Sequence, residues 1–294
     1  MKVYDMFSFY NEFEILEIRL KELWDTVDYF VLVESNTTFT GLPKEYFFEN
    51  NKERFAPYLE KIRHIKLDDS IEEQRRALPG QIDDTWVREK YQRYIAHKEL
   101  NDVSPEDLLI ISDCDEIPRA DMIEMIKGDE NDYDRYIVYI AQFNYKINYM
   151  KIQHPSSHPA IIVVRGRVFT NPQQEREYSF YWNAKPTNTV SVHHGGWHFT
   201  YFGNEDHCLN KIKSFAHTEQ NVGKIVDEYN IAWMIRNKYG HEGIDSKHNE
   251  RFEYVVVDEY FPKCITENLD QWDHMIIPDA VFRVDDLYRE NEKY

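Results

Sequence analysis

Three acidic residues follow directly on an apolar run in the middle of the chain. The segment Asp107–Pro118 reads DLLIISDCDEIP, and it brings Asp113, Asp115 and Glu116 within four positions of one another. Carboxylates this close repel each other unless a cation or a polar ligand lies between them. The segment therefore indicates either a ligand site or the acidic first turn of a helix, where the helix dipole favours negative charge.

The spacing of these acids suits a divalent cation. Asp113 and Asp115 are two residues apart, so in an extended backbone both carboxylates point to one side and can converge on one ion. All-oxygen ligation suits Mg²⁺ or Mn²⁺, which takes its remaining ligands from phosphates and water. On this hypothesis Asp115 is the preferred direct ligand. Glu116 either supports the site or caps a helix, and Asp115 or Glu116 can also hold a sugar hydroxyl.

The elements that must position these acids read as alternating strands and helices. The predicted strands are residues 2–9, 27–33, 61–67 and 107–112. The predicted helices between them are residues 11–24, 52–59 and 85–100, the first capped by Asn11. This alternation predicts a doubly wound α/β sheet over the first half of the chain. Ligands of such sheets bind beyond the carboxyl ends of the strands, where the three acids lie.

The second half of the chain has a different pattern. Residues 135–149 and 160–169 are long β-prone runs without a clear helix between them, which predicts mixed or antiparallel pairing. A further strand is expected over 190–201. Late helices are expected over residues 204–220 and 226–239, and residues 252–294 read as mostly irregular. We therefore expect a mixed central sheet flanked by helices, with a C-terminal extension.

Composition excludes several classes of protein. Of the 294 residues, 42% are hydrophobic and 15% aromatic, which is too apolar for a disordered chain. The formal net charge of −18 disfavours nucleic acid as a partner. Cys114, Cys208 and Cys264 are widely spaced and odd in number, so no disulfide framework is implied. The charged N-terminus and the lack of long apolar runs predict neither a signal peptide nor an integral membrane segment.

Three segments, in order, resemble glycosyltransferase family 17, which includes the enzyme that adds the bisecting N-acetylglucosamine of N-glycans. They are residues 5–44 (DMFSFYNEF to GLPK), LLIISDCDEIP, and GGWHFTYFG followed by KIKSFAHTE. The resemblance implies a GT-A-type fold, a UDP-N-acetylglucosamine donor, a glycan or other hydroxyl acceptor, inversion at the anomeric carbon, and Mn²⁺ or Mg²⁺ at the Asp-x-Asp motif. The animal members carry an N-terminal membrane anchor and work in the Golgi, whereas this sequence begins at its first predicted strand. We therefore expect a soluble or cytoplasmic protein in a bacterial or viral setting, with an acceptor that can differ from theirs.

With this resemblance, the chain divides into a GT-A-like domain and an extension. The domain is expected over residues 1–225, with a nucleotide-binding half over 1–118 and an acceptor and metal half over 119–225. Residues 226–294 form a helical and irregular extension packed on the same domain. The oligomeric state is left open.

A histidine is expected as the third metal ligand. His198 ends a β-prone run and follows two glycines in GGWHF. The glycines allow another part of the backbone to approach closely. A buried histidine bonded to backbone is the competing interpretation. His193, His194 and His217 are the other candidates, with His217 as runner-up.

An inverting transfer needs a base for the acceptor hydroxyl. Glu205 and Asp206 lie just beyond His198 at the expected start of a helix, where capping is the alternative role, and Glu205 is preferred. Lys211 and Lys213 can reach the diphosphate or can be solvated surface lysines.

The loops after the first two strands are the expected nucleotide cradle. The candidate residues for the nucleotide are Phe7, Asn11, Glu34, Asn36, Thr38, Arg88 and Arg93. Phe7 is otherwise core, Asn11 otherwise a helix cap, and the two arginines otherwise form surface pairs with nearby glutamates. Tyr145, Trp182 and Trp197 can stack on sugars or belong to the core.

Two other functions compete with glycosyl transfer. A strand ending in Asp-x-Asp also serves metal-dependent phosphohydrolases, although here the acids come after three strands rather than near the N-terminus. A non-enzymatic glycan-binding protein would use its aromatic side chains and acids to hold sugars and Ca²⁺, but such modules are usually all-β.

Overall fold

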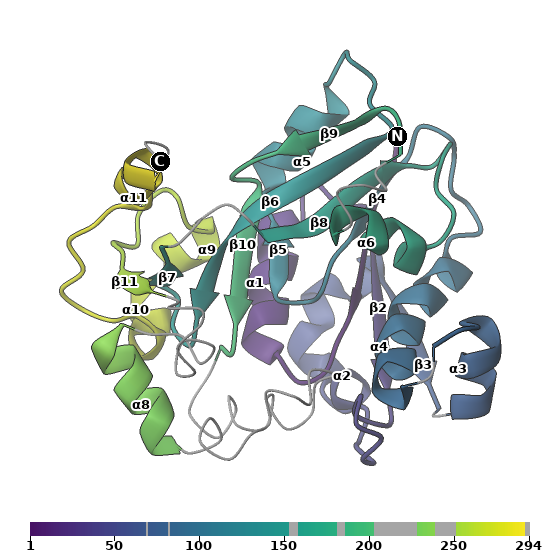
Figure 1. The fold of residues 1–294 in the computed structure, drawn as a ribbon, viewed down its shortest axis with the longest axis horizontal. Coiled ribbons are helices and arrows are strands. Elements are labelled where there is room, and N and C mark those ends of the chain that lie inside the picture. The colour runs from purple at the N-terminus through teal and green to yellow at the C-terminus, as the bar shows by residue number, and fades with distance from the viewer. Residues whose placement is uncertain are drawn as a thin grey trace.

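A mixed β-sheet with helices on both faces forms the centre of the molecule in the computed structural model (Figure 1). The structure describes residues 1–68, 70–81, 83–152, 158–180, 186–202, 228–238 and 251–291. The strands are β1 (Val3–Ser8), β2 (Tyr29–Ser35), β3 (Ile62–Leu67), β4 (Leu108–Ile111), β5 (Glu116–Pro118), β6 (Arg135–Asn144), β7 (Tyr149–Lys151), β8 (His158–Arg165), β9 (Thr189–Val192), β10 (Gly196–Thr200) and β11 (Phe252–Tyr254).

The helices connect and cover these strands. The α-helices are α1 (Phe13–Leu23), α2 (Phe47–Asn50), α3 (Ile71–Ala77), α4 (Asp84–Ile95), α5 (Ala120–Lys127), α6 (Pro172–Phe180), α8 (Glu228–Asn237), α9 (Lys263–Thr266), α10 (Leu269–Trp272) and α11 (Val284–Asn291). The 3₁₀-helices are η1 (Lys52–Lys61), η2 (Ala96–Glu99) and η6 (Asp273–Met275). None of these described helices has the length and apolar character needed to cross a bilayer.

The sheet joins a parallel half to an antiparallel half. Its main order is β11-β7-β6-β8-β4-β1-β2-β3, in which β3, β2, β1 and β4 are parallel neighbours. β8 runs antiparallel to both β4 and β6. β10 branches from this path, because it pairs in parallel with β6 and antiparallel with β5. The predicted mixed α/β sheet flanked by helices is confirmed.

The continuous apolar strands are buried on both faces. In β2, Phe30 and Leu32 point into the cluster that contains α1, whereas Val31 and Val33 point into the cluster that contains Tyr91 of α4. Because successive side chains of a strand point to opposite faces, a strand covered on both sides needs apolar residues at every position. This is why the predicted parallel strands read as unbroken apolar runs.

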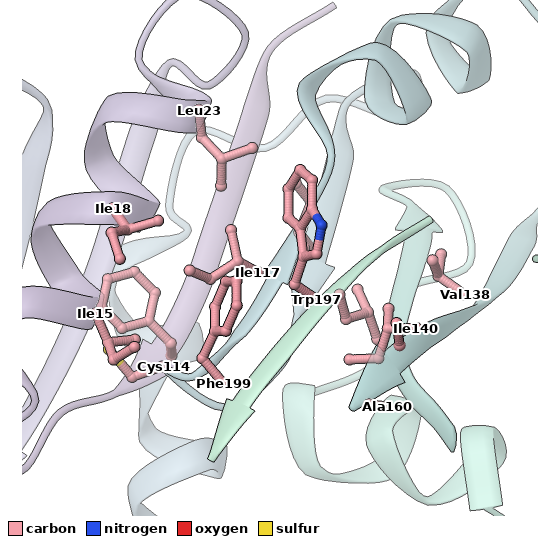
Figure 2. Packing of buried hydrophobic residues seen from close by; sticks show 14 of the residues in the cluster. Ile15, Ile18, Leu23, Cys114, Ile117, Val138, Ile140, Ala160, Trp197 and Phe199 are labelled. Carbon is pink, nitrogen blue, oxygen red and sulfur yellow. The ribbon is translucent and has the colours of Figure 1, made fainter. Parts of the chain in front are cut away.

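The core on the α1 face reaches from the parallel strands to β10. Figure 2 shows Ile15, Ile18 and Leu23 of α1 directed toward Ile117 of β5 and the aromatic side chains of β10. Full burial of an aliphatic side chain of this size stabilises the fold by about 1.5–3 kcal/mol. The same packing that forms the core therefore holds β5 and β10, the two strands beside the acidic segment, against α1.

One predicted strand differs from the observed ones. The strand expected over 190–201 is two strands, since β9 pairs with the first half of β6 and β10 with its second half. The turn between them places His194 at a positive φ of 58°, and Gly196 lies so close to the carbonyl of Ile117 that a Cβ would not fit.

The C-terminal segment is also more regular than expected. It contains β11, which pairs with β7, and the short helices α9, α10 and α11. The helix expected over 226–239 corresponds to α8, whereas the one expected over 204–220 lies outside the described residues. The proposed domain boundaries remain a prediction.

Candidate functional site

The acidic segment forms a tight turn between β4 and β5 at the carboxyl edge of the parallel strands. Ser112 to Asp115 make the turn, and Glu116 begins β5, so the alternative of an acidic helix start is wrong. The backbone N–H of Glu116 donates to the carbonyl of Asp113 at 3.0 Å, which closes the turn. As a result the acids do not all face one point, and Asp113 and Asp115 have different surroundings.

Asp113 lies between two arginines from two helices. Arg93 of α4 donates to its Oδ1 at 2.9 Å, and Arg176 of α6 donates to its Oδ2 at 3.3 Å. Arg176 also donates to Oε1 of Glu116 at 2.7 Å, while Oε2 of Glu116 accepts the N–H of Asp113 at 2.8 Å. Burial alone would lower the pKa of Arg93, but Asp113 and Glu89 outweigh burial and raise it. This part of the site is a network of compensated charges.

Asp115 faces His198 across the β5–β10 pair. His198 is in register with Glu116, and the N–H of Phe199 donates to the carbonyl of Asp115 at 2.9 Å. The Oδ2 of Asp115 and the Nε2 of His198 are 3.6 Å apart, and both side chains are largely buried. Of the sequence candidates, these two are the pair that the structure brings together as a carboxylate and an imidazole.

Among the residues that the structure describes, a divalent cation would have two protein ligands here, Asp115 and His198. An oxygen and a nitrogen separated by 3.6 Å can occupy neighbouring positions around one ion. In the described part of the chain, no group of three or more His, Cys, Asp or Glu residues could hold a metal. Mg²⁺ commonly keeps several ligand positions for phosphates and water, so these two side chains can serve as its protein ligands.

The competing histidines lie elsewhere. His193 stacks on Tyr139, and His194 contacts the ring of Tyr288; both histidines lie before the start of β10. His217 lies outside the described residues, as do the candidate bases Glu205 and Asp206. Trp182, Lys211 and Lys213 also lie outside them.

A buried arginine supports the acidic turn from below. Arg19 of α1 forms an ion pair with Asp5 of β1, at 2.5 and 2.8 Å, and neither side chain is exposed. It also donates to the hydroxyl of Ser112 at 2.7 Å. Its other acceptors are the carbonyls of Asp113, Cys114 and Glu116, at 2.9, 3.2 and 2.9 Å. Burial opposes the charge of Arg19, but Asp5 outweighs it and raises its pKa.

Most of the expected nucleotide residues have structural partners. Glu34 is fully buried and accepts the backbone N–H groups of Phe48 and Glu49 at the start of α2, as well as His64 Nε2. Thr38 accepts the N–H of Leu42 within its own loop at 3.0 Å.

The remaining candidates on this side vary. Asn36 bonds to Asp68 at 3.2 Å. Phe7 is buried under the guanidinium of Arg19. Arg88 lies against the loop at Gly41, with its guanidinium 3.5 Å from the carbonyl of Phe39.

Two rings and a lysine lie together beyond the end of β1. Tyr10 and Phe47 lie edge to face with centroids 5.5 Å apart, and Lys44 Nζ lies 5.4 and 5.1 Å from them. Burial lowers the pKa of Lys44 to about 8, although Glu34 and Glu12 act in the opposite direction. Asn11 adjoins this group, and its buried Oδ1 has no hydrogen-bond partner among the described residues.

Several of these residues were not among the sequence candidates. Arg176 belongs to α6, a helix that the sequence pattern did not predict, and Lys44 was only the last residue of the segment 5–44, with no role assigned. Arg19 carried a usable signal, because it lies three residues after Leu16 and four before Leu23, on the apolar stripe of α1. A charge at such a position needs a buried partner. Trp197 and Tyr145 are buried in the core rather than presented to a ligand.

The profile of glycosyltransferase family 17 matches residues 1–279. A beta-1,4-mannosyl-glycoprotein 4-beta-N-acetylglucosaminyltransferase from Rattus norvegicus is 31% identical over 43% of this chain and 23% of its own length. Its counterpart from Homo sapiens is 32% identical over 40% of this chain and 22% of its own length. The chain thus spans less than a quarter of the curated relatives it matches, and their mammalian origin gives no support to a bacterial or viral setting.

Solved structures show weaker similarity. A galactosyltransferase, LgtC, in complex with donor and acceptor sugar analogues is 12% identical, with coverage of 65% of this chain and 73% of that one and a TM-score of 0.33. A mycobacterial protein is 8% identical, with coverage of 65% and 66% and a TM-score of 0.32.

Proposed function

The chain belongs to glycosyltransferase family 17, and from this we propose that it transfers N-acetylglucosamine from a UDP-sugar to a hydroxyl of a glycan acceptor. The donor and acceptor are inferred from the names of the mammalian relatives, which describe N-acetylglucosaminyltransferases that act on mannosyl-glycoproteins. We also propose that the fold is of the GT-A type and that the transfer inverts the anomeric carbon.

The observation that carries this proposal is the position of the Asp115–His198 pair. It lies at the carboxyl edge of the parallel strands, beside Arg93 and Arg176 and on the same edge as Lys44. Negative charge accumulates on a nucleoside diphosphate as it leaves a sugar, so a transferase needs cationic groups at this point. Arg93 and Arg176 are already compensated by Asp113 and Glu116, so on this proposal the positive charge comes from a cation at the Asp115–His198 pair and from Lys44.

We infer that Asp115 and His198 hold Mn²⁺ or Mg²⁺, which when bound supplies positive charge to the departing diphosphate. Asp113, held by two arginines, is fixed as an acceptor for sugar or ribose hydroxyls rather than as the main metal ligand. Lys44 donates to the diphosphate or the uracil, and Tyr10 packs against the base. Glu205, or Asp206, takes the proton of the acceptor hydroxyl.

The test measures UDP release from UDP-N-acetylglucosamine with a mannose-containing oligosaccharide acceptor, in the presence of Mn²⁺ or of a chelator. Asp115→Asn and His198→Ala are expected to lower the rate by about 100-fold or more, a loss typical of removing one preorganised charge contact. Asp270→Asn, an exposed acid on α10, is the matched control and keeps full activity.

Each alternative has its own result. Release of phosphate from a phosphomonoester without release of UDP would replace the proposal by a phosphohydrolase. Sugar binding that persists without any nucleotide binding, including in Asp113→Ala, would indicate a glycan-binding protein. Metal-independent UDP release in the wild type would remove the cation from the mechanism.

A further inference from the structure

A cavity lies away from the acidic turn. Its volume is about 690 Å³, within the range of small-molecule sites. It lies between α5, the turn before β10 and the C-terminal segment that includes α11. Gly195, which lines the cavity, directly precedes the Gly196–Pro118 end of the β5–β10 pair. His198 is paired with Glu116 at the other end, next to Asp115. This separation is about 10 Å along the strands, at about 3.3 Å per residue.

The walls of this cavity are held together by bonds across elements. Arg119, at the start of α5, donates to the carbonyl of Tyr260 at 3.1 Å, and the indole N–H of Trp197 donates to the same carbonyl at 3.1 Å. The hydroxyls of Tyr260 and Tyr288 are 3.1 Å apart, which joins the loop before α9 to α11. Hydrogen bonds between the elements therefore fix the walls of the cavity relative to one another.

The lining combines apolar surface with oxygen acceptors. Met122 and Val192 contribute apolar contacts, and the two tyrosines contribute ring and hydroxyl surface. Burial raises the pKa of Tyr260 to about 12 and also raises that of Tyr288, so both hydroxyls stay protonated at neutral pH. Because the two hydroxyls bond to each other, one proton of the pair is left to donate to a ligand. Such a mixture matches a pyranose ring, which has apolar C–H faces and a rim of hydroxyls.

The charge of the lining further limits the class of ligand that the cavity can bind. The cavity has four carboxylates, those of Asp121, Asp258, Glu259 and Asp285. This excess of acid disfavours a phosphate or an acidic sugar. Arg119 binds Asp121 at 3.0 Å, and Arg283 lies within 3.3 Å of both Asp258 and Glu259, so two arginines compensate half of the charge of the four carboxylates. The carboxylate oxygens still accept bonds from hydroxyl groups.

We propose that this cavity binds a neutral oligosaccharide, namely a part of the acceptor glycan remote from the hydroxyl that is glycosylated. The inference rests on the proposed function and extends it to the acceptor. α11, which supplies Asp285 and Tyr288, lies beyond the residues 1–279 that the family profile matches. The cavity is thus partly built from a segment that the family description does not cover, which suits a role in the acceptor choice of this particular chain.

The experiment uses the full chain without donor or metal, so that it does not depend on catalysis. Binding of a neutral oligosaccharide containing mannose and N-acetylglucosamine is measured by calorimetry for the wild type, Asp285→Ala and Tyr288→Phe. Each variant removes one hydrogen-bonding group and is expected to weaken binding about 3- to 10-fold. Asp286→Ala, the neighbouring exposed acid that does not line the cavity, is the matched control and binds as the wild type.

The other outcomes overturn the inference. Equal affinity in all four proteins would place the oligosaccharide elsewhere, and no binding at millimolar oligosaccharide would remove the site. Binding of an oligolysine peptide that is lost in Asp285→Ala, without oligosaccharide binding, would assign the cavity to a basic polypeptide. A parallel thermal-shift titration with UDP and Mn²⁺ separates the two proposals, because failure at the nucleotide site leaves oligosaccharide binding unchanged.

Discussion

Replacement of Arg19 by methionine tests how the fold holds the acidic turn. The change removes the positive partner of a fully buried Asp5 and leaves three turn carbonyls without their donor. Breaking a buried ion pair on one side costs about 3–5 kcal/mol. Since a domain is stable by about 5–15 kcal/mol in total, Arg19→Met is expected to fold but to unfold at much lower urea concentration.

A second variant separates charge from positioning. In Asp5→Leu with Arg19→Met the uncompensated carboxylate is absent, so part of the lost free energy of unfolding returns. The bonds from Arg19 to the carbonyls of Asp113, Cys114 and Glu116 remain absent, so UDP release stays low at a temperature where the double variant is fully folded.

The assays are urea unfolding followed by circular dichroism, and UDP release as a function of Mn²⁺ concentration. A double variant no more stable than Arg19→Met would refute the assignment of the cost to the buried charge. Wild-type activity in the double variant would show that the turn keeps its geometry without Arg19.

Three further predictions concern the surroundings of the site. UDP binding measured by calorimetry is expected to weaken as the pH rises from 7 through the Lys44 pKa of about 8, because the ammonium is then lost. Lys44→Met should bind UDP more weakly, with an affinity that does not change over this pH range. A pH-dependent affinity in that variant would assign the effect to another group. Glu34→Gln is expected to lower the free energy of unfolding by about 1–3 kcal/mol, since the amide cannot accept hydrogen bonds from both N–H groups at the start of α2 and from His64. Urea unfolding measures this change, and an unchanged midpoint would contradict the prediction. Gly196→Ala is expected to displace β10 from Ile117 and reduce both thermal stability and UDP release, whereas a wild-type melting temperature would show that the strands can separate without cost.

The parallel half of the sheet could be predicted because strands covered on both faces need apolar residues at every position, and β2 and β4 meet that condition. The position of Asp113 and Asp115 beyond β4 followed from the same pattern. Their different partners could not be predicted, since Arg93 and Arg176 reach Asp113 from helices that are distant in sequence.

The structural partners of the nucleotide candidates could not be predicted for a related reason. Glu34 follows a buried strand, as a ligand-binding acid would, but the chain folds back so that its carboxylate binds the start of α2. Sequence periodicity cannot predict this contact between the end of β2 and the start of α2. The short elements of the C-terminal segment were missed because three or four residues, as in β11 and α9, are too few to show a period.

Locating the cation tests the central claim most directly. Crystals of the full chain grown with UDP and Mn²⁺ would be measured at the manganese absorption edge, where anomalous scattering marks the ion. We expect one peak within coordination distance, about 2.0–2.3 Å, of Asp115 and His198, with the diphosphate as a further ligand. A diphosphate bound at another part of the sheet, or a manganese peak away from both side chains, would contradict the account.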